Sequence, residues 1–258
     1  MYKIISKQVI ATDIKRIQVT AEIISRKAKP GQFVMVVPDG KSSKIPLAIV
    51  ETDPKRGLIT LIFEEAGDTT KALGALQIGD PVFAILGPLG VPAEMKDSGV
   101  IAFVAHGVAI ANILWICRAY RQAGHKIIGL ISAKTKRSLI LESQMRLACH
   151  KLYVATEDGT YEKRGGITGI LPDVLKRENA NTVFAAGPLT TLDEISRMTE
   201  AKKTKIFVGL QPMMVDGIGL CGSCRVKVDG KEILACVEGP WFDARKVDFQ
   251  NLKMRMGL

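Results

Sequence analysis

Residues 100–132 read VIAFVAHGVAIANILWICRAYRQAGHKIIGLIS. The stretch opens with a β-branched and aromatic run at residues 100–105, which the pair His106-Gly107 interrupts. A helix-like segment follows at residues 110–123, and residues 126–132 are again rich in isoleucine. Strand, turn, helix and strand in this order predict a βαβ unit whose parallel strands are buried.

The same stretch raises the question of a membrane span. Residues 99–117 contain only His106 and Asn112 as polar side chains, and their length approaches the roughly 20 residues that a spanning helix needs. Because His106-Gly107 divides the run into a strand and a helix, we predict no span. Basic residues interrupt the first 19 residues, so we expect no export signal and a cytoplasmic protein. These residues are Lys3, Lys7, Lys15 and Arg16.

The alternation continues towards the C-terminus. Helix-like and strand-like segments succeed one another, with helices expected at 138–149, 167–177 and 192–201 and strands at 152–156, 182–186 and 205–208. Such alternation predicts a parallel sheet with helices on both faces. We expect residues 97–209 to form one nucleotide-binding-like α/β domain.

Residues 1–96 have a different pattern, with short β-rich runs separated by turn signals such as Lys29-Pro30-Gly31. The expected strands are 4–9, 14–24, 33–37, 47–51, 58–64 and 81–86, with one short helix at 69–76. Their regular spacing predicts a six-stranded antiparallel barrel. The fold class is therefore α/β plus all-β.

The last 49 residues, 210–258, are rich in glycine and cysteine and too few for an apolar core of their own. They contain Asp216, Cys221, Cys224 and Cys236, spaced Asp-x4-Cys-x2-Cys-x11-Cys. The plant-type [2Fe–2S] pattern is Cys-x4-Cys-x2-Cys followed by a distant cysteine, so an aspartate stands at the first ligand position. We predict an iron–sulfur segment, with Asp216 the least certain of its four ligands.

Other interpretations of the cysteines stay open at this point. A structural zinc site requires four cysteine or histidine ligands, and no histidine is near the three thiols in sequence. Three unrelated thiols are a further alternative. The odd total of five cysteines argues against a disulfide framework. Cys117 and Cys149 fall on apolar helix faces, where we expect core residues.

The charge is strongly basic but dispersed. Thirty-six lysines and arginines against 26 acidic residues give a net charge of +10. No basic run reaches the length of a nucleic-acid-binding arm, and aromatic residues make up only 5% of the chain. We expect a solvated basic surface, suited to an acidic partner, and no binding of nucleic acid.

Residues 212–249, PMMVDGIGLCGSCRVKVDGKEILACVEGPWFDARKVDF, carry a specific family resemblance. With the preceding barrel and α/β domain, the chain resembles the ferredoxin–NADP⁺ reductase-like flavoproteins. Within them it is similar to the electron-transfer subunit of dihydroorotate dehydrogenase. It is closer still to the small subunit of NADH-dependent ferredoxin:NADP⁺ oxidoreductase, also called a sulfide dehydrogenase subunit. The resemblance implies FAD and a [2Fe–2S] cluster as cofactors.

The resemblance also implies where FAD lies. The segment supporting the isoalloxazine maps to Pro46, Leu47 and Ala48, and the next flavin-contacting strand maps to Ile62, Phe63 and Glu64. The pyrophosphate turn maps to Gly67, Thr69 and Thr70, where open backbone N–H groups and hydroxyls suit an anion. Ala48 departs from the serine or threonine that is usual in the family.

The NAD(P)H site is implied less completely. Of the glycines that the family has after the first α/β strand only Gly107 is present, while His106, Ala109 and Asn112 replace other positions. This change is either drift in a tolerant turn or a loss of nucleotide binding. Elsewhere the implied contacts persist at Asp158, Gly159, Gly187 and Pro188. Basic residues after the second strand leave NADH and NADPH both open; these are Lys134, Lys136 and Arg137.

The resulting hypothesis is an oxidoreductase subunit that passes electrons between NAD(P)H, FAD, the [2Fe–2S] cluster and a larger flavin/iron–sulfur subunit. Ferredoxin is a possible further partner. No catalytic acid–base residue is expected, because hydride transfer depends mainly on positioning. The alternative is a non-enzymatic relay subunit that keeps FAD and the cluster but has a degenerate NAD(P)H site.

Overall fold

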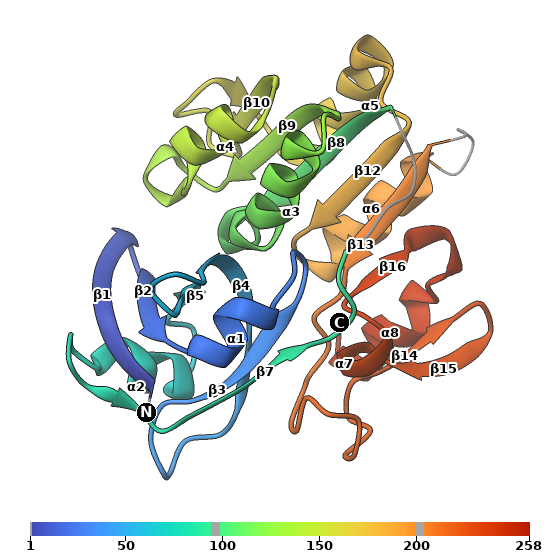
Figure 1. The fold of residues 1–258 in the computed structure, drawn as a ribbon. Coiled ribbons are helices and arrows are strands. Elements are labelled where there is room, and N and C mark those ends of the chain that lie inside the picture. Colours follow the sequence, from blue (N-terminus) through green and yellow to red (C-terminus); the bar gives the residue numbers. More distant parts are fainter. Residues whose placement is uncertain (1, 94–98, 200–203) are drawn as a thin grey trace. The chain divides into compact units, whose positions relative to one another are not determined.

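A computed structural model describes residues 2–93, 99–199 and 204–258. The expected domain boundary between residues 96 and 97 and the end of the expected helix 192–201 lie outside these ranges. The chain divides into two compact units, which we call the barrel unit and the α/β unit (Figure 1). The barrel unit comprises Met1–Ala93, Gln211–Arg225 and Leu234–Pro240, and the α/β unit comprises Glu94–Leu210, Val226–Ile233 and Trp241–Leu258.

The barrel unit contains one antiparallel seven-stranded sheet that curls into a nearly closed barrel. The strand order is β6-β1-β2-β5-β4-β3-β7. The strands are β1 (Tyr2–Ala11), β2 (Ile14–Thr20), β3 (Phe33–Val37), β4 (Ile45–Asp53), β5 (Leu58–Glu64), β6 (Pro81–Val82) and β7 (Ala84–Leu89). The antiparallel barrel expected from residues 1–96 is therefore confirmed.

The barrel has seven strands where the sequence predicted six. The run expected as one strand at 81–86 is divided at Phe83, whose side chain is exposed. The two halves pair at opposite edges, β6 with β1 and β7 with β3. In the sequence, Phe83 looks like one more apolar residue of a continuous strand. Its exposure, and therefore the break, is visible only in the structure.

A second difference concerns the strand expected at 14–24, because β2 ends at Thr20 and helix α1 (Glu22–Lys27) follows. The apolar and β-branched Ile23 and Ile24 suggested a strand. Local contacts favour the helix instead: Arg26 lies 2.7 Å from the Glu22 carboxylate, and the Ser25 hydroxyl donates to the Glu22 carbonyl. The helix expected at 69–76 is present as α2 (Asp68–Ala75).

The α/β unit contains a second seven-stranded sheet in the order β11-β10-β9-β8-β12-β13-β16. The strands are β8 (Val100–His106), β9 (Lys126–Ala133), β10 (Lys151–Thr156), β11 (Lys163–Arg164), β12 (Thr182–Ala186), β13 (Lys205–Gly209) and β16 (Trp241–Asp243). All neighbours are parallel except β16, which pairs antiparallel with β13. The expected parallel sheet is thus present, with one antiparallel strand from the C-terminal region at its edge.

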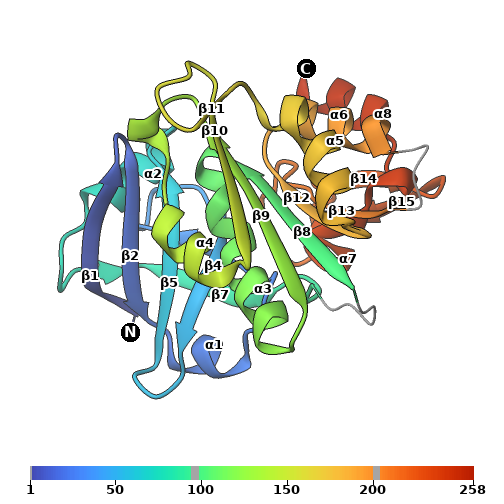
Figure 2. The ribbon, with the colours of Figure 1, turned by 90° about the horizontal axis from the view of Figure 1, so that it is seen from above.

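Helices cover both faces of this sheet, as the alternation predicted (Figure 2). Helices α3 (Ile110–Gln122) and α4 (Glu142–Ala148) contact each other on one face, and α5 (Ile167–Glu178) and α6 (Leu189–Thr199) contact each other on the opposite face. The strand order reverses between β8 and β12. In doubly wound sheets ligands bind at such a switch point, beside the carboxyl ends of the strands.

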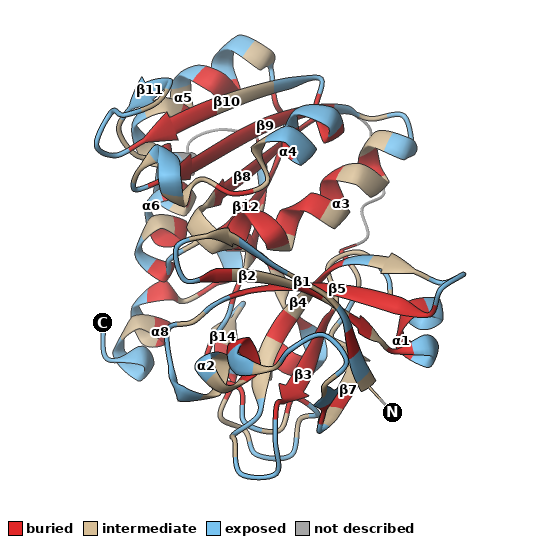
Figure 3. Cartoon of the chain, turned by 90° about the vertical axis from the view of Figure 1, so that its left-hand side faces the viewer, coloured by how far each residue is buried: buried red, intermediate tan, exposed pale blue. Residues whose placement is uncertain are grey.

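Buried apolar strands form the core of each unit (Figure 3). In the α/β unit, Phe184 stacks between Phe103 and Phe207, with ring centroids 5.2 and 5.3 Å away. Trp241 of β16 meets the Phe184 ring edge-on at 5.6 Å. The C-terminal strand therefore obtains its apolar packing from the sheet, as expected for a segment too short for its own core.

The remaining C-terminal elements are β14 (Arg225–Val228), β15 (Lys231–Leu234), α7 (Ala235–Glu238) and α8 (Phe249–Met256). Strands β14 and β15 form a hairpin. An ion pair between Lys253 of α8 and the buried Asp193 of α6 holds the C-terminal helix. Among the described residues, no helix has both the length and the apolar character needed to cross a membrane.

Candidate cofactor sites

The residues expected to support the flavin lie on two neighbouring strands of the barrel. Pro46, Leu47 and Ala48 are on β4, with Leu47 buried and the other two half-buried. The second group occupies the end of β5, where Ile62 and Phe63 are buried and the Glu64 side chain is exposed. The half-buried face of β4 leaves Pro46 and Ala48 accessible to a flat aromatic ligand.

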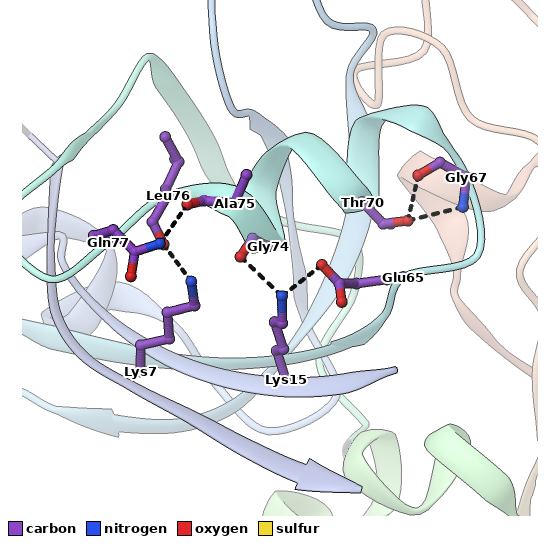
Figure 4. A network of polar contacts seen from close by, with 9 residues as sticks. All are labelled: Lys7, Lys15, Glu65, Gly67, Thr70, Gly74, Ala75, Leu76 and Gln77. Carbon is purple, nitrogen blue, oxygen red and sulfur yellow. Dashed lines mark hydrogen bonds and ion pairs between the residues drawn. The ribbon is translucent and has the colours of Figure 1, made fainter. Parts of the chain in front are cut away.

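The expected pyrophosphate turn forms the N-terminus of α2 (Figure 4). The Thr70 hydroxyl accepts a hydrogen bond from the Gly67 N–H at 3.0 Å and donates to the Gly67 carbonyl at 2.8 Å. A Cβ atom built on Gly67 would meet no atom within 4 Å, so open space lies in front of the turn. Thr69 and Thr70 lie half-buried beside it, and their hydroxyls can donate hydrogen bonds to an anion.

Asp216 begins the loop that carries the cysteines. Its carboxylate accepts hydrogen bonds from the backbone N–H groups of Ile218, Gly219 and Cys221, the first two at 2.9 and 3.2 Å. These hydrogen bonds hold the pKa of Asp216 below its usual value, and the bond from the Ile218 N–H has the largest effect. Gly217 and Gly219 have φ of 77° and 88°, so the tight path of the loop depends on glycine.

The three expected cysteine ligands differ in exposure: Cys221 and Cys224 lie in the loop, and Cys236 lies in helix α7. Cys221 is exposed, and its Sγ lies 3.1 Å from the Ser223 hydroxyl, a contact that lowers the pKa of the thiol. Cys224 and Cys236 are buried, and the Cys236 N–H points at the Cys224 Sγ at 3.5 Å. Burial, and then the neighbouring Cys224 thiol, raises the pKa of Cys236 to about 12.

The donor set of one carboxylate and three thiols has the number of ligands that a [2Fe–2S] cluster needs. Among the described residues, no three histidine, cysteine or acidic side chains converge closely enough to hold one ion. A [2Fe–2S] cluster divides four ligands between two irons, so its ligands need not converge on one point. All three histidines are distant in sequence from the three thiols.

The cysteine loop packs directly on the barrel. A Cβ on Gly217 would lie 2.4 Å from Met35 Cγ on β3 and 3.2 Å from the Leu89 side chain on β7. The Val91 N–H donates to the Gly239 carbonyl at 2.6 Å. Met35 is the cross-strand partner of Pro46. The loop that begins at Asp216 therefore contacts the strand adjacent to the proposed flavin support.

In the α/β unit, His106 is the last residue of the first strand, β8, and directly precedes the turn. Its Nδ1 lies 2.9 Å from the Ser132 hydroxyl at the end of β9, and its Nε2 lies 3.7 Å from the Glu157 carboxylate after β10. Burial lowers the pKa of His106 despite Glu157. The next residue, Gly107, has φ of 59° and open space around it. The imidazole thus lies across three strand ends at the switch-point edge of the sheet.

The other residues expected at the nucleotide site lie at the same carboxyl edge. Gly187 and Pro188 follow β12, and a Cβ on Gly187 would lie 3.6 Å from His106 Cβ. Asp158 and Gly159 follow β10. The Thr160 N–H donates to the Asp158 carboxylate at 3.0 Å and lowers the pKa of Asp158. The structure brings the His106 turn and Gly187 together, while the Asp158 carboxylate is occupied within its own loop.

The basic residues after β9 are exposed, namely Lys134, Lys136 and Arg137. Lys136 lies over the Tyr161 ring, with its Nζ 3.8 Å from the ring centroid. Acidic Glu157 and Asp158 follow the neighbouring strand. Both charge signs therefore flank this end of the sheet.

Comparison with known proteins places these features in a family. Residues 211–248 match the iron–sulfur cluster binding domain of dihydroorotate dehydrogenase B. The chain is 33% identical to a dihydroorotate dehydrogenase B (NAD⁺) electron transfer subunit homologue from Thermotoga maritima, covering 98% of this chain and 90% of the relative. This chain belongs to the family of dihydroorotate dehydrogenase B electron-transfer subunits and their homologues.

Other relatives agree. The electron transfer subunit of Geobacillus thermodenitrificans is 26% identical over 95% of this chain and 96% of its own length. A solved structure of NADH-dependent reduced ferredoxin-NADP oxidoreductase, described for flavin-based electron bifurcation, aligns with TM-score 0.94 and 33% identity, covering 100% of this chain and 93% of that one. The family resemblance expected from residues 212–249 is confirmed.

Three structural contributors were absent from the predicted site. Ser223 was visible between two expected ligands, and its position could have suggested a contact with a ligand sulfur. Met35 and Lys15 carried no such signal, because their importance comes from tertiary contacts with Gly217 and with helix α2.

Proposed function

We propose that this chain is the electron-transfer flavoprotein subunit of a heteromeric oxidoreductase. It exchanges electrons with NADH or NADPH through FAD and passes them through a [2Fe–2S] cluster to a larger flavin/iron–sulfur subunit. The observation that carries the proposal is the packing of the cysteine loop on the barrel, where Gly217 contacts Met35, the strand partner of Pro46. This contact brings the two proposed cofactor segments together in one compact unit.

The residues have distinct proposed roles. Pro46, Ala48 and the end of β5 support the flavin, while the Gly67–Thr70 turn holds its diphosphate. Cys221, Cys224 and Cys236 hold the cluster with Asp216 as the fourth ligand. Three backbone N–H groups use part of the acceptor capacity of its carboxylate, and a lone pair remains for iron. When bound, FAD supplies the conversion between a two-electron hydride and single electrons. The chain supplies position and tuning, and hydride transfer requires no acid–base residue from it.

The proposed docking surface for the larger subunit surrounds the cysteine loop. Large apolar side chains are exposed there, and a relay centre must come close to its electron acceptor. These side chains are Met213, Val215, Ile218, Leu220 and Val237, with Leu220 83% exposed next to Cys221. The +10 charge suits an acidic partner or ferredoxin. A cytoplasmic location is part of this proposal.

The direct test is an anaerobic titration of the purified complex with NADH, followed by visible absorbance. We expect the flavin band to bleach at near-stoichiometric NADH. Bleaching by dithionite alone would contradict a dehydrogenase role for this chain. Iron and acid-labile sulfide analysis of this chain purified apart from its partner tests the cluster, because a zinc site would contain neither and the larger subunit brings iron–sulfur centres of its own.

The filled nucleotide turn supports a second candidate function. His106 and Ala109 carry side chains where a pyrophosphate-binding turn favours glycine, and the His106 imidazole is fixed by Ser132. Under this alternative the chain is a relay that keeps FAD and the cluster without binding NAD(P)H. The same titration separates the two, since a relay gives no spectral change with NADH while dithionite reduces it.

A further inference from the structure

Lys15 and Glu65 form an ion pair against the backbone of helix α2 (Figure 4). The Lys15 Nζ donates to the Glu65 carboxylate at 2.7 Å and to the Gly74 carbonyl at 2.9 Å. Both charged side chains are largely covered, with 17% and 18% of their surfaces exposed. The pair is therefore partly desolvated, and removal of one partner leaves the other charge uncompensated.

Gly74 makes room for this pair. A Cβ atom at position 74 would lie 1.8 Å from the Glu65 Oε1 and 3.0 Å from the Lys15 Nζ. Glycine is the least favourable residue in a helix interior apart from proline, yet it occupies a buried position of α2. The seating of the ion pair gives a physical reason for this choice.

The pair connects the elements that carry the proposed flavin contacts. Lys15 on β2 is the cross-strand partner of Phe63 on β5. Glu65 follows directly after the flavin-contacting end of β5, and two residues later Gly67 starts the diphosphate turn. Gly74 lies in the same helix whose N-terminal residues form that turn. Movement of α2 along the barrel would displace Gly67 and Thr70 relative to β5.

We propose that the Lys15–Glu65 ion pair, seated on Gly74, is a positioning device that fixes the FAD diphosphate turn relative to the flavin-supporting strands. The inference rests on the proposed binding of FAD in the barrel unit. The ion pair also reduces the negative charge around the diphosphate turn. Glu64, Glu65 and Asp68 all flank a turn meant for an anionic ligand, and Lys15 compensates the one that is most covered.

The test compares Lys15→Met with Arg16→Met in the full chain. Arg16 is the next residue of β2 and contacts Gln8 and Glu51, away from α2. We expect Lys15→Met to weaken FAD affinity about tenfold, measured by flavin fluorescence quenching on reconstitution of the apoprotein. Arg16→Met is expected to stay within about twofold of the unchanged chain, and Lys15→Arg to recover most of the affinity.

Gly74→Ala provides a second variant that keeps both charges. Its methyl group meets the flexible end of Glu65, so the fold is expected to survive while the ion pair is displaced. We expect FAD affinity to fall as in Lys15→Met, with circular dichroism and the electron paramagnetic resonance signal of the reduced cluster unchanged. Loss of these signals together with FAD would indicate general unfolding and overturn a positioning role.

Normal FAD affinity in both Lys15→Met and Gly74→Ala would also overturn the inference. The unchanged chain provides the reference for the underlying proposal. If it fails to bind FAD, the proposed function itself fails. If it binds FAD and the variants bind equally well, only the positioning role is lost.

Discussion

The two expected phosphate-binding turns of this chain differ in construction. The barrel-unit turn at Gly67 is open, with no atom within 4 Å of an added Cβ, and Thr70 caps its helix. The α/β-unit turn contains His106, whose imidazole is fixed by Ser132 and lies close to Glu157. Only Gly107 keeps a glycine conformation there. Each turn keeps open space at one glycine, Gly67 or Gly107, but the α/β turn also carries the side chains of His106 and Ala109 where a pyrophosphate-binding turn favours glycine.

This difference indicates that the two sites face unequal constraints. The barrel turn belongs to the same compact unit as the cysteine loop, and its cofactor is proposed to remain bound through every turnover. A nucleotide binds and leaves, so a weaker site is compatible with function. The comparison therefore predicts that the flavin and cluster segments respond independently of the nucleotide turn.

The largest expected effect is loss of the cluster in Cys224→Ala. Cys224 is buried, and its Sγ accepts a hydrogen bond from the Cys236 N–H. The neighbouring thiols of Cys221 and Cys236 are themselves proposed ligands, so they cannot replace it. We expect complete loss of the cluster absorbance and of its paramagnetic signal, with FAD retained. Cys149→Ala is the control, because Cys149 is a buried cysteine of the α/β unit. Equal loss in both variants would show that cysteine removal acts through stability.

The next effect concerns the open turn itself. Gly67 has an extended backbone with φ of −143°, which valine adopts readily, so Gly67→Val is expected to fold. Its side chain would fill the space proposed for the diphosphate. We expect FAD affinity to fall about a hundredfold, measured by reconstitution of the apoprotein. Gly40→Val, whose Cβ would meet only Phe83 at 3.6 Å, is expected to bind FAD normally.

A smaller effect is expected in the filled turn. Replacing His106 and Ala109 by glycine removes the side chains that hinder approach of a pyrophosphate. We expect His106→Gly/Ala109→Gly to bind NADH about tenfold more tightly in a calorimetric titration, with unchanged FAD content. His125→Gly serves as the histidine control. Weaker NADH binding in the double variant would mean that the imidazole is a nucleotide contact and not an obstruction.

The smallest effect is on the pH dependence of stability. Burial lowers the pKa of His106 below its unfolded value of about 6.5, so between these two values the unfolded chain binds more protons. The stability is fully present above pH 6.5 and declines as the pH falls towards the folded pKa. We expect Tm to drop more for the unchanged chain than for His106→Asn between pH 7.5 and 5.5. Equal drops would contradict a lowered pKa.

The sequence predicted the two architectures because periodicity survives in each segment. The expected strand 182–186 coincides with β12, and the barrel follows from short runs between turns. Some elements were missed because tertiary contacts decide them: strand β16 exists because Trp241 packs on Phe184. Helix α1 was missed for a local reason, because it replaces the end of an apolar run that equally suited a strand.

The candidate site divides in the same way. The spacing indicated that Asp216 and the cysteines belong together. In the structure Asp216 contacts Cys221 in the loop, and Cys236 of α7 contacts Cys224, although the ligand roles stay predictions. The departure at the nucleotide turn could be seen in the sequence, because His106 and Ala109 stand where the family resemblance implies glycine. The approach of Ser132 and Glu157 to His106 could not be predicted. His106 ends β8, Ser132 lies in β9 and Glu157 follows β10, so the contacts depend on how these strands pair.

Gly74 has a consequence for how this barrel can change in evolution. An alanine at position 74 requires a shorter or reoriented residue at 65, and without Glu65 the Lys15 ammonium loses its partner beneath the helix. The three positions cannot be exchanged one at a time without an intermediate that carries a clash or a stranded charge. In lineages descended from this sequence, residues 15, 65 and 74 are therefore expected to be inherited as a set or replaced as a set.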